Sequence, residues 1–264
     1  MSIFNYHLLK GIGFSDQRVL QVLPRLRSQD FEEGDIILRK GAEVPSLLYL
    51  CSGMVGAGLP TPGQSCQPLK IYGLGTWFAE TALLTGDRPS WEYAALTSCR
   101  VLAIPMEDAA NAFAQDLEFS RFMARLTAWR NQQNQELSAL QQHGNPQLRV
   151  VLGLALLIEA LHNSASHLPT SDLGVDLDIP LNQSLLASLC GVSRGIFSDC
   201  VQQLAEAGWL TPKYATLTLR KVATWTSISS RFRTIRYLDS KPSMQDLLAQ
   251  FEPTHSTYLT AQRT

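Results

Sequence analysis

Residues 181–210, with the sequence LNQSLLASLCGVSRGIFSDCVQQLAEAGWL, decide the fold of the C-terminal half of the chain. A first helix is expected to begin near Asn182, whose side chain can accept a hydrogen bond from the free N–H groups of a helix start. Gly191 then supplies a turn, because glycine adopts positive φ at little cost. Ser193 is expected to cap a second helix, which ends at Gly208. Two short helices joined by such a turn are the arrangement that places the second helix in a DNA major groove.

The second helix has two distinct faces. Apolar residues at offsets 0, 3, 4 and 7 form the inner face, and they are Phe197, Cys200, Val201 and Leu204. The outward face carries the candidate DNA-binding residues, which are Ser193, Arg194, Gly195, Ser198, Asp199 and Gln202. Arg194 can bind a phosphate or a guanine edge, and Ser198 and Gln202 can hydrogen-bond to bases. An ordinary helical hairpin would show the same pattern.

The segment after the second helix favours a winged helix. Residues 209–211 and 215–219 are expected to be strands, and residues 212–214 the turn between them. Lys213 at the tip of this hairpin and Arg220–Lys221 at its exit are expected to contact DNA phosphates. The alternative is a basic turn that is merely solvated.

Composition limits the class of protein. The chain has 264 residues, 45% of them hydrophobic, and a net charge of −1, which suits one large or two modest soluble domains. No apolar stretch is long enough for a membrane span, and the N-terminus lacks the pattern of a secretory leader. The five cysteines form no CxxC pair, so we expect a reduced, cytoplasmic protein with no metal site and no membrane partner.

The average charge hides an asymmetry. Residues 191–264 hold nine basic and five acidic side chains, whereas residues 1–190 hold 13 basic and 18 acidic ones. An acidic first part and a basic second part indicate two domains with different partners.

The N-terminal part is expected to be a β structure. Residues 31–105 contain short apolar runs, such as 36–38, 47–50 and 101–104, separated by glycine and proline turns. Many short strands at regular spacing favour a barrel or a sandwich.

A long helix is expected from about residue 107 to residue 142, where neither proline nor glycine occurs. Steps of four and three residues form a heptad seam, which comprises Phe119, Met123, Leu126, Arg130, Gln133, Leu137 and Leu140. This seam either packs on the helix's own domain or forms a two-chain coiled coil. A helix at 147–163, a loop at 164–174 and a strand at 175–179 are expected to follow.

This order of elements and its motifs resemble the Crp/Fnr family of bacterial transcription regulators, over roughly residues 20–222. The most similar stretch, residues 189–194 (LCGVSR), looks like the family's turn into its recognition helix. Residues 75–86 (GTWFAETALLTG) resemble the phosphate-binding cassette of a cyclic-nucleotide-binding barrel. The resemblance implies an α+β fold with an N-terminal β-roll or jelly-roll barrel, a long dimerisation helix and a C-terminal winged helix-turn-helix. The expected domains are residues 1–116, 117–143 and 144–225, followed by an extension at 226–264.

The resemblance also implies an effector site in the barrel. Glu80 stands where the family's ribose-binding glutamate stands, and Thr81, Arg88 and Ser90 are the nearest candidates for the phosphate. Gln133 and Asn134 stand near the helix positions that contact the base. Two departures are Ala79, in place of the usual glycine, and Glu92, an acid near the expected phosphate. The effector is therefore either a cyclic nucleotide (cAMP or cGMP) or another small molecule, unless the pocket is degenerate.

The function implied is a homodimeric transcription regulator. It would read a pseudo-palindrome in double-stranded DNA, with half-sites about one helical turn apart, and RNA polymerase is a further expected partner. Gly195 and Asp199 depart from the family's recognition helix, so the operator should differ from the common half-site. The alternative is a nucleotide-type sensor module that acts through protein partners. No HExxH, GxSxG, P-loop or GxGxxG motif occurs, so neither an enzyme nor catalytic residues are expected.

The C-terminal extension lies beyond the resemblance. Arg231, Arg233 and Arg236 are spaced as neighbours on a helix, and residues 246–251 are expected to form a short amphipathic helix. The extension either packs on the winged domain or adds a DNA contact.

Overall fold

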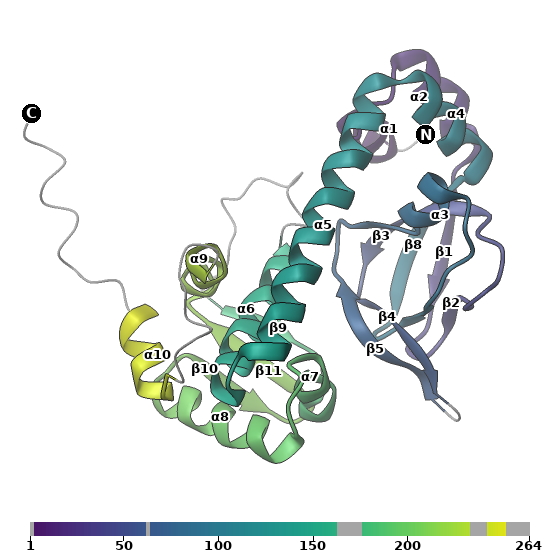
Figure 1. Cartoon of the computed structure of the whole chain (residues 1–264). Coiled ribbons are helices and arrows are strands. Elements are labelled where there is room, and N and C mark those ends of the chain that lie inside the picture. Colours follow the sequence, from purple (N-terminus) through teal and green to yellow (C-terminus); the bar gives the residue numbers. More distant parts are fainter. Residues whose placement is uncertain (1–2, 62–63, 163–175, 233–241, 252–264) are drawn as a thin grey trace, which may run out of the picture. The chain divides into compact units, whose positions relative to one another are not determined.

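The computed structural model describes residues 3–61, 64–162, 176–232 and 242–251 (Figure 1). The loop expected at 164–174, the start of the strand expected at 175, Arg233, Arg236 and the end of the chain lie outside these ranges. The chain divides into two units, which are described separately below. Among described residues, the first unit comprises 3–136 and 159–162, and the second comprises 137–158 and 176–251.

The first unit contains an eight-stranded β-sandwich. One sheet has the order β1-β8-β3-β6, with β1 Arg27–Phe31, β3 Ser46–Ser52, β6 Trp77–Phe78 and β8 Cys99–Pro105. The other has the order β2-β7-β4-β5, with β2 Ile36–Leu38, β4 Val55–Thr61, β5 Gln64–Tyr72 and β7 Glu92–Ala95. All pairings are antiparallel, so the barrel or sandwich expected from the short apolar runs is confirmed.

Alternation along the strands fills the space between the two sheets. Leu50, Val55, Phe78 and Val101 are at most 1% exposed there, since every second residue of a strand points to the same face. The rings of Tyr72, Phe78 and Tyr93 pack together, with centroids 5.7 to 5.8 Å apart. The inner face of the sandwich is therefore a packed aromatic and aliphatic core.

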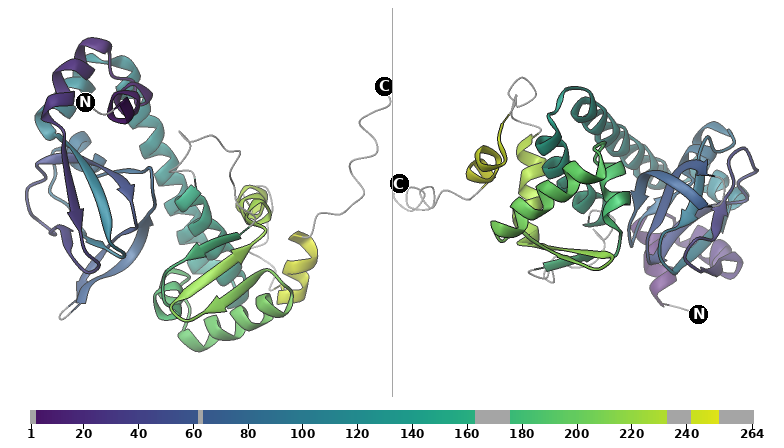
Figure 2. Two further views of the ribbon diagram at one scale, coloured as in Figure 1. Left: turned by 180° about the vertical axis from the view of Figure 1, so that it is seen from behind. Right: turned by 90° about the horizontal axis from the view of Figure 1, so that it is seen from below.

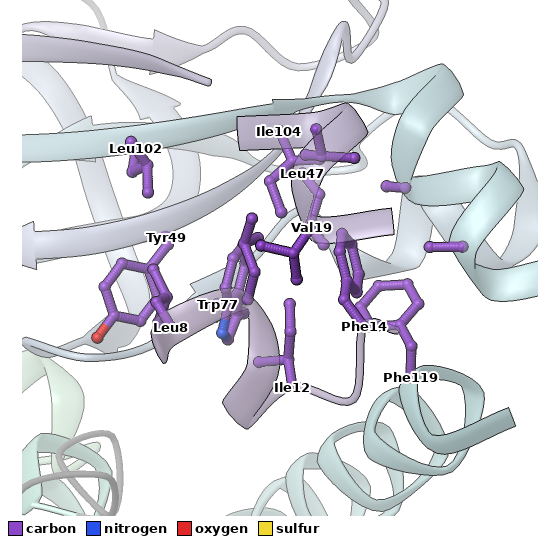
Figure 3. Close-up of a cluster of buried hydrophobic side chains, with 14 of the residues drawn as sticks. Leu8, Ile12, Phe14, Val19, Leu47, Tyr49, Trp77, Leu102, Ile104 and Phe119 are labelled. Atoms are coloured by element: carbon purple, nitrogen blue, oxygen red, sulfur yellow. The ribbon is translucent and has the colours of Figure 1, made fainter. Parts of the chain in front are cut away.

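Helices close one end of this unit. They are α1 Ile3–Gly11, α2 Asp16–Val22, a 3₁₀ turn Leu23–Arg25 and α4 Met106–Gln115. Figure 3 shows their apolar side chains around Trp77 and the first turn of α5, Leu117–His143. Phe14 meets Phe119 edge to face at 4.7 Å, a favourable aromatic geometry.

The seam of α5 packs on its own unit along its N-terminal half. Phe119 and Met123 are fully buried in this core and Leu126 packs against it, while Arg130 is 4% exposed. Of the two alternatives for the seam, the structure thus supports packing on the helix's own domain as far as Arg130. A dimer contact through α5 would have to use another face of the helix.

The second unit contains the winged helix. Its elements are α6 Pro146–His162, up to Ile158, then β9 Asp176–Ile179, α7 Gln183–Leu189, α8 Arg194–Glu206, β10 Leu210–Lys213, β11 Thr216–Arg220, α9 Val222–Phe232 and α10 Met244–Phe251. The three strands form one antiparallel sheet in the order β10-β11-β9, which lies beside α7 and α8 (Figure 2). Trp209 and Trp225 pack edge to face in its core, at 5.7 Å. Across the described ranges, no single helix is both long and apolar enough to cross a bilayer.

Candidate functional site

The helix-turn-helix has the predicted local geometry. The Asn182 side chain accepts from the N–H of Leu185 at 2.9 Å, and the Ser193 hydroxyl accepts from the N–H of Ile196 at 3.3 Å. Gly191 takes φ +67°, so it makes the turn that a side chain would strain. The chain bends by 101° between α7 and α8, within the range of DNA-binding helix pairs. Both predicted caps are confirmed.

The two faces of α8 separate as the spacing predicts. Phe197, Cys200, Val201 and Leu204 are at most 2% exposed. The residues of the outward face are all exposed, and they are Ser193, Arg194, Gly195, Ser198, Asp199 and Gln202. No atom lies within 4 Å of the position that a Cβ would take on Gly195, so the backbone there is open to close approach. This face therefore offers one cation and several hydrogen-bonding groups on a rigid support.

Ile196 also belongs to this face, and the sequence analysis did not include it. Its side chain is 38% exposed although its neighbour Phe197 is fully buried. The sequence could have indicated this exposure, because Ile196 lies one position before the apolar stripe that begins at Phe197 and is therefore outside it. An exposed aliphatic group on such a helix can contact the methyl group of thymine.

The wing places its tip one residue later than expected. Lys213 ends β10 and pairs with Thr216, so the turn consists of Tyr214 and Ala215, the latter at φ +54°. Tyr214 is fully exposed. The Lys213 ammonium lies 3.5 Å from the Asp178 carboxylate, and both side chains are more than half exposed. Such an exposed pair is weak, so Lys213 can exchange it for a phosphate.

The cations after the wing are partly engaged within the fold. Arg220 donates to the Thr211 hydroxyl at 3.0 Å, and the Lys221 ammonium lies 5.9 Å from the Trp209 ring centroid. Both side chains remain exposed. Arg220 ends β11 and Lys221 follows it, so both keep their positive charge in the same unit as Lys213.

The barrel cassette begins with a strained turn. Ala79 caps α3 Glu80–Thr85 at φ +68°, a left-handed conformation in which a glycine is unstrained. Ala79 thus adopts a backbone conformation that suits the glycine implied here by the family resemblance. The turn directs Glu80 into the unit, where this carboxylate residue is 7% exposed.

Glu80 is held by an arginine of the long helix. The Arg130 guanidinium forms an ion pair with the Glu80 carboxylate and also donates to the carbonyl of Trp77. Both charged side chains are at least nine-tenths buried, so each depends on the other for compensation. Sequence reasoning did not assign Arg130 to the site. The available signal was that a charged residue interrupts an apolar seam.

Arg130 and a second cation, Lys70, both lie near the ring of Tyr72. Arg130 lies 5.1 Å and the Lys70 ammonium 5.6 Å from the centroid of the Tyr72 ring. Lys70 pairs with the inward-facing Ala57 and shares a strand face with Tyr72. Burial lowers the pKa of Lys70 to about 8, and repulsion by Arg130 adds to that effect. The cluster therefore carries more positive than negative charge.

Four of the other predicted effector residues do not join this cluster. Thr81, Arg88, Ser90 and Asn134 are exposed, while Gln133 is 8% exposed. The Arg88 guanidinium donates to the carbonyl of Gly41 at 3.3 Å and lies 3.7 Å from the Glu43 carboxylate. Glu92 alternates with the core residue Tyr93 along β7 and so faces the other side of the sheet.

A cyclic nucleotide does not fit these residues as they are placed. Its phosphate requires an arginine within the pocket, but Arg88 is at the surface and 65% of its side chain is exposed. Its ribose requires an available carboxylate, but that of Glu80 is paired with Arg130. The neighbouring rings of Tyr72 and Tyr93 are packed in the core of the sandwich, with centroids 5.8 Å apart.

A shallow apolar groove lies between α5 and the cassette. It is lined by Leu84, Phe113, Ala124, Thr127, Ala128 and Asn131. The α5 residues of this groove are small and differ from those of the buried seam, so a second helix could approach closely here.

No group of three or more His, Cys, Asp or Glu side chains in the described ranges is placed to hold a metal ion. The cysteines there are free thiols, and burial raises the pKa of Cys190 to about 12. A thiol with so high a pKa is unreactive at neutral pH.

Residues 28–116 match the family model of the cyclic nucleotide-binding domain. No curated protein sequence matches the chain. Solved structures do match it. FixK2 from Bradyrhizobium japonicum is 14% identical, with a TM-score of 0.61 over 76% of this chain and 96% of that one.

Two further structures agree. The c-di-GMP-responsive global regulator CLP of Xanthomonas campestris is 17% identical, with a TM-score of 0.56 over 78% of this chain and 99% of that one. TTHA1359 from Thermus thermophilus, a transcriptional regulator of the CRP/FNR family, is 18% identical, with a TM-score of 0.54 over 77% of this chain and 98% of that one. The expected fold is thus confirmed: this chain has a cyclic nucleotide-binding domain and the fold of Crp/Fnr transcription regulators.

Proposed function

We propose that this chain is a DNA-binding transcription regulator that acts as a homodimer on a pseudo-palindromic site. The observation that carries the proposal is the outward face of α8, which is exposed, capped and firmly anchored by a fully buried inner face. The cations of the wing, Lys213, Arg220 and Lys221, add a phosphate-binding surface on the same unit. The fold shared with the regulators TTHA1359 and CLP supports this function.

In this proposal the residues of α8 have distinct roles. Arg194 binds a guanine edge or a phosphate near the helix start, and Ser198 and Gln202 donate to base edges one and two turns later. Asp199 accepts from a cytosine amine, and Ile196 contacts a thymine methyl group. Gly195 allows the backbone to approach the DNA. Lys213 binds a phosphate and fixes the register without selecting a sequence.

The dimer would form through the long helix of residues 117–143. The apolar groove beside Ala124 and Ala128 supports this part of the proposal. The α5 side chains that line it are small, so a helix of the second chain can pack closely against them. Two chains related by a twofold axis present two recognition helices, which suit half-sites about one helical turn apart. RNA polymerase is the proposed partner of the complex at a promoter.

Control by an effector needs a different ligand from a cyclic nucleotide in the family's arrangement. The buried pair of Glu80 and Arg130 already connects the cassette to the long helix. We propose that any effector acts by binding one state of this connection better than another, since a ligand shifts an equilibrium only through such a difference.

One arginine substitution and one lysine substitution test the DNA-binding function. Arg194→Ala should weaken binding to a selected duplex about 10- to 100-fold, since a bidentate base contact contributes about 1–3 kcal/mol. Lys213→Ala should weaken binding less and reduce the slope of log affinity against log salt by about 1. Fluorescence anisotropy at several salt concentrations measures both quantities.

Lys40→Ala is the matched control, because Lys40 is an exposed cation of the first unit. It should leave affinity unchanged. If Arg194→Ala and Lys213→Ala also leave DNA retention unchanged, the chain is better described as a sensor module that acts through protein partners.

A further inference from the structure

The joint between α5 and α6, residues 143–146, is held by a contact from Pro242 of the C-terminal extension. Asn145 lies in this joint, and its Nδ2 donates to the carbonyl of Pro242 at 2.9 Å. Its Oδ1 accepts from the N–H of Leu148 at 2.8 Å and so caps the start of α6. One amide side chain therefore serves both the local helix and the C-terminal extension.

The described residues 242–251 of the extension pack on the second unit. Pro242 is buried, and Met244 and Leu247 of α10 are 2% and 0% exposed. Ser243 and Asp246 form a reciprocal cap, in which the Asp246 carboxylate accepts from the N–H of Ser243 at 2.9 Å and the Ser243 hydroxyl accepts from the N–H of Asp246 at 3.2 Å. The start of α10 is thus fixed directly after the carbonyl that Asn145 binds.

The same joint contacts the turn before the recognition helix. Arg149 of α6 donates through Nε to the carbonyl of Gly144 at 2.8 Å and through Nη1 to the carbonyl of Gly191 at 3.2 Å. Gly191 packs on the last turns of α5, where an added Cβ would lie 3.3 Å from Gln141. The end of α5, the joint and the turn into α8 therefore form one connected group within the second unit.

We propose that the C-terminal extension is a positioning element for DNA binding. The Asn145–Pro242 hydrogen bond holds the joint, and Arg149 transmits that constraint to the turn at Gly191. The consequence is a fixed direction of the recognition helix relative to the end of the long helix. This inference rests on the proposed function, because a fixed direction matters when two recognition helices must meet two half-sites together.

Asn145→Asp isolates the contact. An aspartate keeps the oxygen that caps α6 but removes the donor, and it places a carboxylate opposite the Pro242 carbonyl. Affinity for a full palindrome should fall about tenfold, since a looser joint lowers the effective concentration of the second recognition helix. Affinity for a duplex with a single half-site should stay within twofold of the unaltered protein. A merely structural defect would instead lower both affinities together.

Gln142→Glu is the control, since it adds the same charge at an exposed position near the joint and should change neither affinity. A second variant that ends at residue 240 removes Pro242 and α10, and it should show the same loss on the full palindrome. An unchanged full-site affinity in Asn145→Asp, or an equal loss on the half-site, would overturn the inference.

Hydrogen exchange separates this inference from the proposed function, because it needs no DNA. The N–H of Gly144 donates to the carbonyl of Leu140 at 2.8 Å and should exchange at least fivefold faster in Asn145→Asp. An unchanged exchange rate of the Gly144 N–H would contradict the positioning role of the extension even if the protein binds DNA. Faster exchange in a protein without specific DNA binding would overturn the proposed function and, with it, the positioning role.

Discussion

The recognition helix and the barrel cassette differ in what their polar residues contact. On α8 the candidate side chains face solvent, and the helix is anchored from behind by Phe197 and Leu204. In the cassette the candidate carboxylate, Glu80, is buried and paired with Arg130 from a helix 50 residues away in the sequence. Local sequence thus determines a surface that is built on one helix, but not a site that is completed by a distant side chain.

The Glu80–Arg130 pair offers the largest test of this difference. Glu80→Gln or Arg130→Met alone should lower the free energy of unfolding of the first unit by about 3–5 kcal/mol, because each leaves a buried charge without its partner. The double variant should recover most of this loss, since no unpaired charge remains. Urea unfolding followed by tryptophan fluorescence measures the three values. Equal losses of unfolding free energy in the single and double variants would mean that the two buried charges do not compensate each other.

Lys70 gives a smaller, pH-dependent effect in the same cluster. Its pKa lies at about 8 in the folded chain against an ordinary value of 10.5, so between these values the unfolded state binds more protons. The free energy of unfolding should therefore rise with pH across this window, by at most about 1 kcal/mol per pH unit. Lys70→Met should remove this part of the rise. The measurement is the change in the free energy of unfolding between pH 7.5 and pH 10, made on both proteins. An equal rise in both would show that Lys70 is solvated.

The two left-handed alanines give the smallest effect and compare the two regions directly. Ala215 in the wing is exposed at φ +54°, so Ala215→Gly should raise the free energy of unfolding by about 0.5–1 kcal/mol through relief of strain. Ala79 in the cassette is 4% exposed at φ +68°. There the loss of a buried methyl group, about 0.8 kcal/mol, should offset the same relief. Chemical denaturation of both variants tests this order, and a larger gain in Ala79→Gly would contradict it.

The helix-turn-helix of the second unit follows from local chemistry, and the sequence was sufficient to predict it. Asn182, Gly191 and Ser193 set the caps and the turn, and an apolar stripe sets the buried face of α8. The wing tip was misplaced by one residue, because Pro212 reads as a turn residue yet lies in the edge strand β10. An edge position tolerates proline, and nothing local distinguishes it.

The cassette could be located from its motif, but its contacts could not be predicted. Arg130 and Lys70 reach the site from α5 and β5, and their approach depends on tertiary packing. The helices α1 and α2 were likewise missed, although their residues complete the core around Phe119. The domain boundaries, the dimer and the effector remain predictions.

Selection of bound duplexes from a random pool tests the central claim most directly. The account predicts enrichment of a pseudo-palindrome with half-site centres about one helical turn apart, bound by two chains and released steeply by salt. Failure to enrich any sequence, or enrichment that Arg194→Ala leaves unchanged, would contradict the claim that α8 reads DNA.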